Sequence, residues 1–234
     1  MRTLGRLAAI WRFPVKSMAG EALDEAAVGP GGIDGDRRHA FVRDPGPPSF
    51  PWLTAREVPE LLRWRPAAGP DGTMAVARPD GTSLPLDSAE LRAELGRRAG
   101  CAVRLERSDA ALADCHPVSL LGTASLRQLG KALGTALDGR RFRMNLLAEW
   151  DEERPFLEDG LVGRVLRIGD SVRLRLVERD PRCGMIALDP DTARPDPRVV
   201  RAVQATRGGL FGVYATVLAA GTLQMGSVLT LEET

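Results

Sequence analysis

The residue with the clearest chemical potential in this sequence is Cys183, which stands in the stretch VERDPRCGMIALDP at residues 177–190. Structural cysteines usually lie inside apolar elements, where they behave as small hydrophobic residues. Cys183 instead follows charged residues and Pro181, where the backbone is expected to turn and leave the sulfur reachable. A cation beside a cysteine, here Arg182, favours the reactive thiolate form. The residues alone leave open whether Cys183 is a structural cysteine at a turn or an accessible ligand.

A second cysteine, Cys115, is followed directly by His116, and a thiol with an imidazole in contact is the core of a Cys–His hydrolase. If the pair lies on a strand, its side chains point to opposite faces, so packing is the favoured role of Cys115. Cys183 could meet His39 or His116 through the fold instead. A zinc site made of Cys115, His116 and Cys183 lacks metal-ligand spacing and ranks low.

Basic and hydroxyl side chains stand at expected turns, strand ends and helix starts. They are Lys16, Ser17, Arg37, Arg38, Thr123, Ser125 and the RRFR run at 140–143. The planar fork of arginine suits phosphate and other oxyanions, lysine adds a point charge, and hydroxyls at a helix start complete such sites. Each basic residue taken alone is more typical of a solvated surface charge. The chain contains no GxGxxG or Walker A sequence, so an ordinary nucleotide cradle is not indicated.

Size and composition are those of an ordinary globular protein. The chain has 234 residues, 44% hydrophobic and 27% charged, with a formal net charge of +1. The length allows one large domain or two small ones, and the charge gives no sign of nucleic-acid or acidic-membrane binding. Three cysteines without a CxxC pair suit a reducing cytoplasm, and no run of about 18 apolar residues is present. We therefore expect a soluble cytoplasmic protein.

Turn signals every eight to twelve residues predict a β-rich α+β fold with few helices, of barrel or sandwich type. Strands are expected at 4–13, in the segment 21–42 around a glycine-rich turn, and at 101–107, 140–149 and 163–179, with two or three more after 208. Asp-Gly pairs at 71–72 and 80–81 indicate hairpin turns. Helices are expected at 87–100, capped by Asp87 or Ser88, at 119–134, and as a short piece within 54–66.

Several phrases occur together in an order typical of one known family. In the first half they are FPVKSMAGE, GPGGIDGDRRHAFV and WLTAREVPELL. In the second half they are HPVSLLGTASLRQL, RRFRMNLL, PRCGMIALDPDT and FGVYATVLAAGTLQMGSVLTL. These phrases resemble the MOSC family, named for the C-terminal domain of molybdenum cofactor sulfurase, and its N-terminal barrel-like companion domain. Met144 and Ala193 depart from the pattern, because relatives carry proline and glycine there.

The resemblance implies a MOSC β-barrel domain at 88–234 and a smaller barrel-like domain at 1–87. It extends to the mitochondrial amidoxime reducing component and its bacterial relatives, in which a molybdopterin-type cofactor lies between the two domains. It implies that Cys183 is the molybdenum ligand and the catalytic residue. A single thiolate suits a metal whose other sulfur ligands come from a cofactor. The cofactor-binding residues carried over are Lys16, Ser17 and Arg37 on the N-terminal side, and Thr123, Ser125, Arg143 and Asn145 on the MOSC side.

The activity that the resemblance implies is reduction of small N-oxygenated compounds, such as N-hydroxylamines, amidoximes and hydroxylaminopurines. No cysteine-rich extension follows residue 234, so a separate electron donor of the ferredoxin, flavoprotein or cytochrome type is expected. The main alternative is a sulfur or molybdenum-cofactor carrier, in which Cys183 holds persulfide or cofactor transiently. A Cys–His hydrolase ranks last, because nothing in the sequence supports the pairing.

Overall fold

The protein is built mainly of β-strands. The computed structural model describes residues 1–69 and 71–233, and this part of the chain contains three α-helices. No helix among these residues has the length and apolar character needed to cross a membrane. The β-rich α+β class predicted from the sequence is confirmed.

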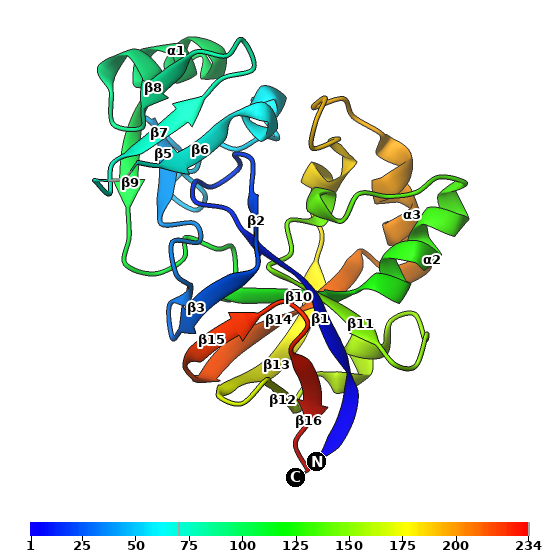
Figure 1. The fold of residues 1–234 in the computed structure, drawn as a ribbon. Coiled ribbons are helices and arrows are strands. Elements are labelled where there is room, and N and C mark those ends of the chain that lie inside the picture. The colour runs from blue at the N-terminus through cyan, green and yellow to red at the C-terminus, as the bar shows by residue number, and fades with distance from the viewer. Residues whose placement is uncertain (70, 234) are drawn as a thin grey trace.

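Seven strands close into a barrel, which fills the lower part of Figure 1. In order around the barrel they are β11 (Leu146–Trp150), β10 (Val118–Gly122), β14 (Leu210–Ala219), β13 (Val172–Pro181), β12 (Val165–Ile168), β16 (Val228–Leu231) and β1 (Arg2–Arg12). The pairing of β1 with β11 closes the circle, and the short β2 (Glu21–Leu23) lies beside β1. Alternate residues of a strand point to opposite faces, so Val172, Leu174 and Leu176 of β13 are fully buried in the barrel core.

The first strand of the chain is part of this barrel. β1 pairs antiparallel with both β11 and β16. At Gly5, which has a φ of 153°, a Cβ atom would lie 2.0 Å from the carbonyl oxygen of Glu149 in β11, so the two strands approach closely only because the residue is glycine. Residues near the N-terminus thus complete a barrel made otherwise of the second half, and the domain boundary at 87–88 stays a prediction.

The other strands form three small sheets. β3 (Glu25–Gly29) pairs with β15 (Gly221–Gln224) on one side and β4 (Gly32–Ile33) on the other, and β5 (His39–Asp44) pairs with β9 (Ala102–Arg107). The third sheet contains β6 (Arg65–Ala68), β7 (Met74–Ala77) and β8 (Ser83–Pro85). Gly72 and Gly81 adopt φ values of 77° and 85° in the two turns of this sheet, which confirms the hairpins predicted from the Asp-Gly pairs. Residue 70, in the first of these turns, lies outside the described residues.

The helix predicted at 87–100 is confirmed as α1 (Ala89–Ala99). The Ser88 hydroxyl accepts a hydrogen bond from the Leu91 amide, and Gly100 ends the helix in the left-handed conformation. The short helix predicted within 54–66 is a 3₁₀ helix at Pro59–Arg63. Proline fits its first turn because that position needs no amide donor.

Two predicted elements were wrong in part. The helix expected at 119–134 begins only at Thr123, as α2 (Thr123–Leu133), because the preceding apolar run is the buried strand β10. A short apolar run does not distinguish a buried strand from a helix by its periodicity. The strand expected at 140–149 is a 3₁₀ helix at Gly139–Phe142, followed by β11. Arg143, with a φ of 53°, separates the two elements.

A third α-helix, α3 (Pro197–Arg207), was not predicted from the sequence. Its N-terminus is capped by Asp196, whose side chain accepts a hydrogen bond from the Arg198 amide. α2 and α3 lie together beside one end of the barrel (Figure 1). α3 also packs against the 3₁₀ helix Gly184–Ala187, which directly follows Cys183. Helix α3 therefore supports the loop that carries the cysteine.

Candidate functional site

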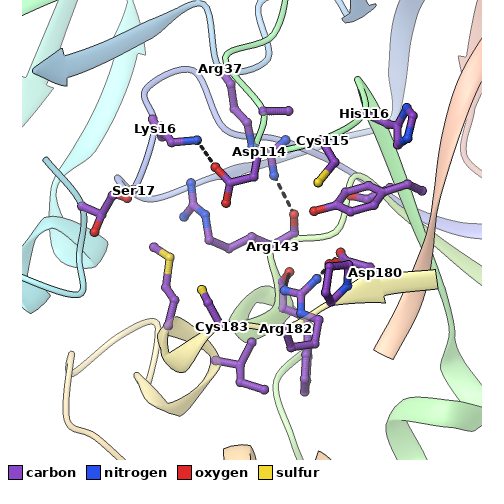
Figure 2. A pocket seen from close by; sticks show the side chains of 18 of the residues that line it. Lys16, Ser17, Arg37, Asp114, Cys115, His116, Arg143, Asp180, Arg182 and Cys183 are labelled. Carbon is purple, nitrogen blue, oxygen red and sulfur yellow. Dashed lines mark hydrogen bonds and ion pairs between the residues drawn. The ribbon is translucent and has the colours of Figure 1, made fainter. Parts of the chain in front are cut away.

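A cavity of about 170 Å³ lies where the end of the barrel meets the loops of the first half of the chain. Its wall is formed by the segment after β1, the loop before β10, the turn before β11 and the end of β13. Figure 2 shows the side chains that converge on it. Six of the residues carried over by resemblance line this cavity: Lys16, Ser17, Arg37, Arg143, Asn145 and Cys183.

Lys16 is buried in the cavity wall and held by the loop before β10. Its Nζ atom donates to the Leu112 carbonyl oxygen at 2.8 Å and to Asp114 Oδ1 at 2.5 Å. Burial lowers the pKa of Lys16, and the partner Asp114 only partly offsets this effect. The Nζ atom also lies 5.8 Å from the ring centroid of Trp52, a cation–π distance.

Arg37 connects the two halves of the protein. Its guanidinium pairs with the buried Asp36 and donates to the Arg143 carbonyl oxygen at 2.8 Å. It also lies 3.4 Å from Asn145 Oδ1, which accepts from the Ser119 amide at 3.2 Å. The Asn145 amide oxygen is therefore occupied by protein donors. Asn145 helps to hold the Arg37 side chain in place at the edge of the cavity.

Arg143 is a half-buried cation without a salt-bridge partner among the described residues. Its Nη1 atom donates to the Met18 carbonyl oxygen at 2.6 Å, whereas Nη2 is buried with no hydrogen-bond partner among the described residues. No carboxylate of those residues forms a salt bridge with it. Burial, with the neighbouring Arg37 and Arg182 charges, lowers the pKa of Arg143 to about 9, so the guanidinium is protonated at neutral pH. A half-buried cation with a buried, unpartnered donor atom favours an anionic ligand.

Three residues of the cavity wall have a left-handed backbone although none is glycine. They are Ser17, Arg37 and Arg143, with φ values of 66°, 48° and 53°. Two others outside the cavity, Phe156 and Ala193, share this conformation in the described part of the chain. Strained backbone persists only where the surroundings hold it in place, and it gathers at binding and catalytic sites.

Cys183 is exposed and lies at the start of the 3₁₀ helix Gly184–Ala187. Figure 2 shows its sulfur directed toward the same space as the Arg143 side chain. Arg141 clamps the following segment by donating to the Ala187 carbonyl oxygen at 2.7 Å and to Asp189 Oδ2 at 3.2 Å. Arg182, paired with Asp180, donates in return to the Phe142 carbonyl oxygen. Hydrogen bonds thus join the RRFR run at 140–143 to the segment 182–189 in both directions. They hold in place the turn that carries the Cys183 thiol.

Thr123 and Ser125 do not line the cavity, so the expectation that they would stand with the other donors is corrected. The Ser125 hydroxyl donates to Glu158 Oε1 at 2.7 Å and accepts from the Phe156 amide at 2.7 Å. The Thr123 hydroxyl is buried without a partner among the described residues. Both belong to the start of α2, where Glu158 also accepts from the Gly122 amide. The Ser125 hydroxyl thus helps to hold the start of α2, and the cofactor-binding roles of the two residues stay a prediction.

Cys115 and His116 both line the cavity, which the sequence interpretation missed. They lie in an irregular segment, so the expectation of a strand that points them to opposite faces does not apply. His116 Nε2 lies 3.2 Å from Glu178 Oε1, and its ring faces Tyr214 at 5.8 Å between centroids. Burial and the carboxylates of Glu178 and Asp114 raise the pKa of the Cys115 thiol. No cluster of three or more His, Cys, Asp or Glu side chains in the described residues is arranged to hold a metal ion.

Family models match both halves of the chain. A model described as the MOSC domain covers residues 107–230, and one described as the MOSC N-terminal beta barrel domain covers residues 4–126. The chain belongs to the MOSC family. The two matches overlap at 107–126, and the N-terminal match includes most of β1, which is a strand of the barrel.

One curated relative of this MOSC protein is mitochondrial amidoxime reducing component 2 of Rattus norvegicus. The two are 32% identical over 137 residues, which span 52% of this chain and 38% of the rat protein. Among solved structures, the YuaD protein from Bacillus subtilis is similar with a TM-score of 0.53 at 12% identity, over 98% of this chain and 96% of that one. A structure titled as a hypothetical protein has a TM-score of 0.50 at 11% identity, covering 99% of this chain and 69% of the other. Both show the same fold.

Proposed function

We propose that this MOSC protein binds a molybdopterin-type molybdenum cofactor in the cavity and reduces N-oxygenated compounds there. The observation that carries the proposal is the unpartnered Nη2 atom of Arg143, in a cavity that Cys183 also lines. A guanidinium with a buried, free donor atom fits an anionic group, and an exposed thiol fits a soft metal. The cofactor combines both features, with a phosphate and a metal bound by sulfur.

The donors around the cavity fit the parts of such a group. Lys16 and Arg37 bring positive charge from the first half of the chain, and the Ser17 side chain adds a hydroxyl. Arg143 brings charge from the barrel side, and Cys183 brings the thiol. When bound, the cofactor supplies two-electron oxygen-atom chemistry. The residues of this chain would orient the cofactor and offset its negative charge. Cys183 would hold its metal at the turn that Arg141 and Arg182 fix in place.

The name of the rat relative supports the choice of substrate class. That protein is described as an amidoxime reducing component, and amidoximes carry the N–O bond that we propose is cleaved here. Because the match spans 38% of the rat protein, its activity is brought to this chain as a proposal only. Electrons would come from a separate carrier protein of the ferredoxin, flavoprotein or cytochrome type.

The proposal is tested by the molybdenum content of protein made in a host that synthesises the cofactor. The Cys183→Ala variant should lose most of the metal, whereas the matched Cys101→Ala variant should keep it, because Cys101 does not line the cavity. Loaded wild-type protein should then reduce an aromatic amidoxime to the amidine with a chemical electron donor. Equal molybdenum in both variants would remove Cys183 as the ligand.

A carrier of sulfur or cofactor is the second candidate, and the exposed thiol of Cys183 favours it. A carrier should release its cargo to an acceptor protein and show no amidoxime reduction. Persulfide on Cys183 without molybdenum, detected by mass spectrometry of the intact protein, would support this candidate and count against the reductase.

A further inference from the structure

Asp180, at the end of β13, is a buried acid of the cavity wall that the proposed cofactor contacts leave unused. Its side chain is 2% exposed. One oxygen, Oδ2, pairs with Arg182 Nη1, whereas Oδ1 is buried with no hydrogen-bond partner among the described residues. A buried carboxylate oxygen that accepts no hydrogen bond raises the free energy of the protein. Burial therefore disfavours the charged form of Asp180, whereas the ion pair with Arg182 favours it.

The groups facing Asp180 come from four parts of the fold. Arg182 lies beyond the end of the same strand, Tyr214 lies on β14, Arg37 lies on the loop after β4, and Cys115 lies on the loop before β10. Burial raises the pKa of Asp180, although Arg182, the Tyr214 hydroxyl and Arg37 act in the opposite direction. Burial and the charge of Asp180 in turn raise the pKa of Tyr214. The ring of His116 also lies near Tyr214, with the two ring centroids 5.8 Å apart.

The reaction proposed above needs a proton source inside this cavity. Reduction of R–NH–OH to R–NH₂ breaks the N–O bond and releases the oxygen as water. It consumes two electrons, from the separate reduced carrier protein, and two protons. A carboxylic acid that reaches the leaving oxygen would make departure as water easier, as general acids do.

On the basis of that proposed function, we propose that Asp180 is the catalytic acid that donates one of the two protons to the leaving oxygen. The second proton comes from solvent. The carboxylate left behind is stabilised by its ion pair with Arg182 and is reprotonated from solvent before the next turnover. Tyr214, beside Asp180, is a positioning residue in this scheme.

The experiment compares wild type with Asp180→Asn and with Asp170→Asn, an exposed aspartate just before the opposite end of β13. In cofactor-containing protein, Asp180→Asn should have the molybdenum content and the KM of wild type. Its kcat should be about 100-fold lower, a decrease typical of a lost general acid. The fall in wild-type kcat as pH rises through the pKa of the acid should be absent in this variant. Asp170→Asn should behave as wild type.

A second measurement uses cofactor-free protein and does not depend on activity. Infrared difference spectra over a pH titration should show the carbonyl band of a protonated buried carboxyl in wild type and Asp170→Asn, and not in Asp180→Asn. If Asp180→Asn fails to fold or to bind the cofactor, Asp180→Glu is the variant to measure. It should retain both the fall in kcat as pH rises and the infrared band.

Wild-type kcat and an unchanged pH profile in molybdenum-loaded Asp180→Asn would overturn the assignment. So would an infrared band that persists in this variant. Loaded wild type that reduces no N-hydroxylated compound would remove the proposed function, and the catalytic role of Asp180 with it. The infrared result would still show separately whether Asp180 holds a proton.

Discussion

The guanidinium carbon of Arg143 lies 4.2 Å from the ring centroid of Phe13, and that of Arg37 lies 4.9 Å from the same centroid. One buried aromatic ring thus contacts two cations that arrive from opposite halves of the chain. Cation–π contact stabilises each of them modestly. Arg37 is neutralised by its ion pair with Asp36, whereas Arg143 has no such partner among the described residues, so Arg143 keeps a positive charge that a bound anion can offset.

Replacing Arg143 with methionine should therefore separate folding from ligand binding. Replacing a cation that has a buried, unpartnered donor atom by an apolar side chain removes an unfavourable term, so cofactor-free Arg143→Met should unfold in urea at the same concentration as wild type or a higher one. Its molybdenum content should fall at least about tenfold, as expected when a charge-assisted hydrogen bond is lost.

The matched control for Arg143 is Arg207→Met. Arg207 also stacks on an aromatic ring, with its guanidinium carbon 3.9 Å from the centroid of Phe156, but it is paired with Asp159. This variant should lose stability because it leaves Asp159 with only the more distant Arg179, 4.0 Å away, and it should keep its molybdenum. A cofactor-free Arg143→Met protein that unfolds more readily than Arg207→Met would contradict the interpretation of Arg143.

The left-handed conformation of Ser17 gives a second prediction. A non-glycine residue in this conformation costs about 1–2 kcal/mol, which a change to glycine would remove. Part of that stabilisation is lost again, because glycine has greater conformational freedom in the unfolded chain. Ser17→Gly should therefore stabilise the cofactor-free protein by up to about 1 kcal/mol and lower molybdenum retention, because the cavity loses a hydroxyl. Thermal unfolding and metal analysis measure the two effects.

Ala193→Gly provides the comparison, since Ala193 has a φ of 59° and lies outside the cavity. It should give a similar gain in stability with unchanged molybdenum. If Ser17→Gly retained as much molybdenum as Ala193→Gly, the hydroxyl of Ser17 would have no part in binding.

The sequence predicts the architecture of this protein better than its site. Strand alternation such as that of β13 comes from burial on one face, which a single sequence displays directly. The left-handed turn at Arg143 and the cavity position of Cys115 arise from contacts between segments far apart in the chain, which local patterns do not record. Ser125 matched a family phrase, yet its hydroxyl is used by Glu158, 33 residues away.

That contact makes Ser125 a test of structural against binding roles. Ser125→Ala should lower the free energy of unfolding by about 1–3 kcal/mol, because the buried Glu158 loses a donor. Thr123→Val should be neutral or stabilising, since the Thr123 hydroxyl is buried without a partner among the described residues. Both variants should retain molybdenum as wild type does. Loss of metal in folded Thr123→Val would restore Thr123 as a binding residue.

The last prediction concerns the second thiol of the cavity, Cys115. Burial and the charges of Glu178, Asp114 and Asp180 raise its pKa, so at a given pH less of it is thiolate than in the unfolded chain. In a Cys101→Ala, Cys183→Ala double variant, where only Cys115 remains, alkylation by iodoacetamide should therefore need a higher pH in native protein than in urea. Glu178→Gln should move the native midpoint back toward lower pH, whereas Glu106→Gln, on β9, should not. A native midpoint at or below the unfolded one would mean that the cavity favours the Cys115 thiolate, and Cys115 would then join Cys183 as a candidate nucleophile.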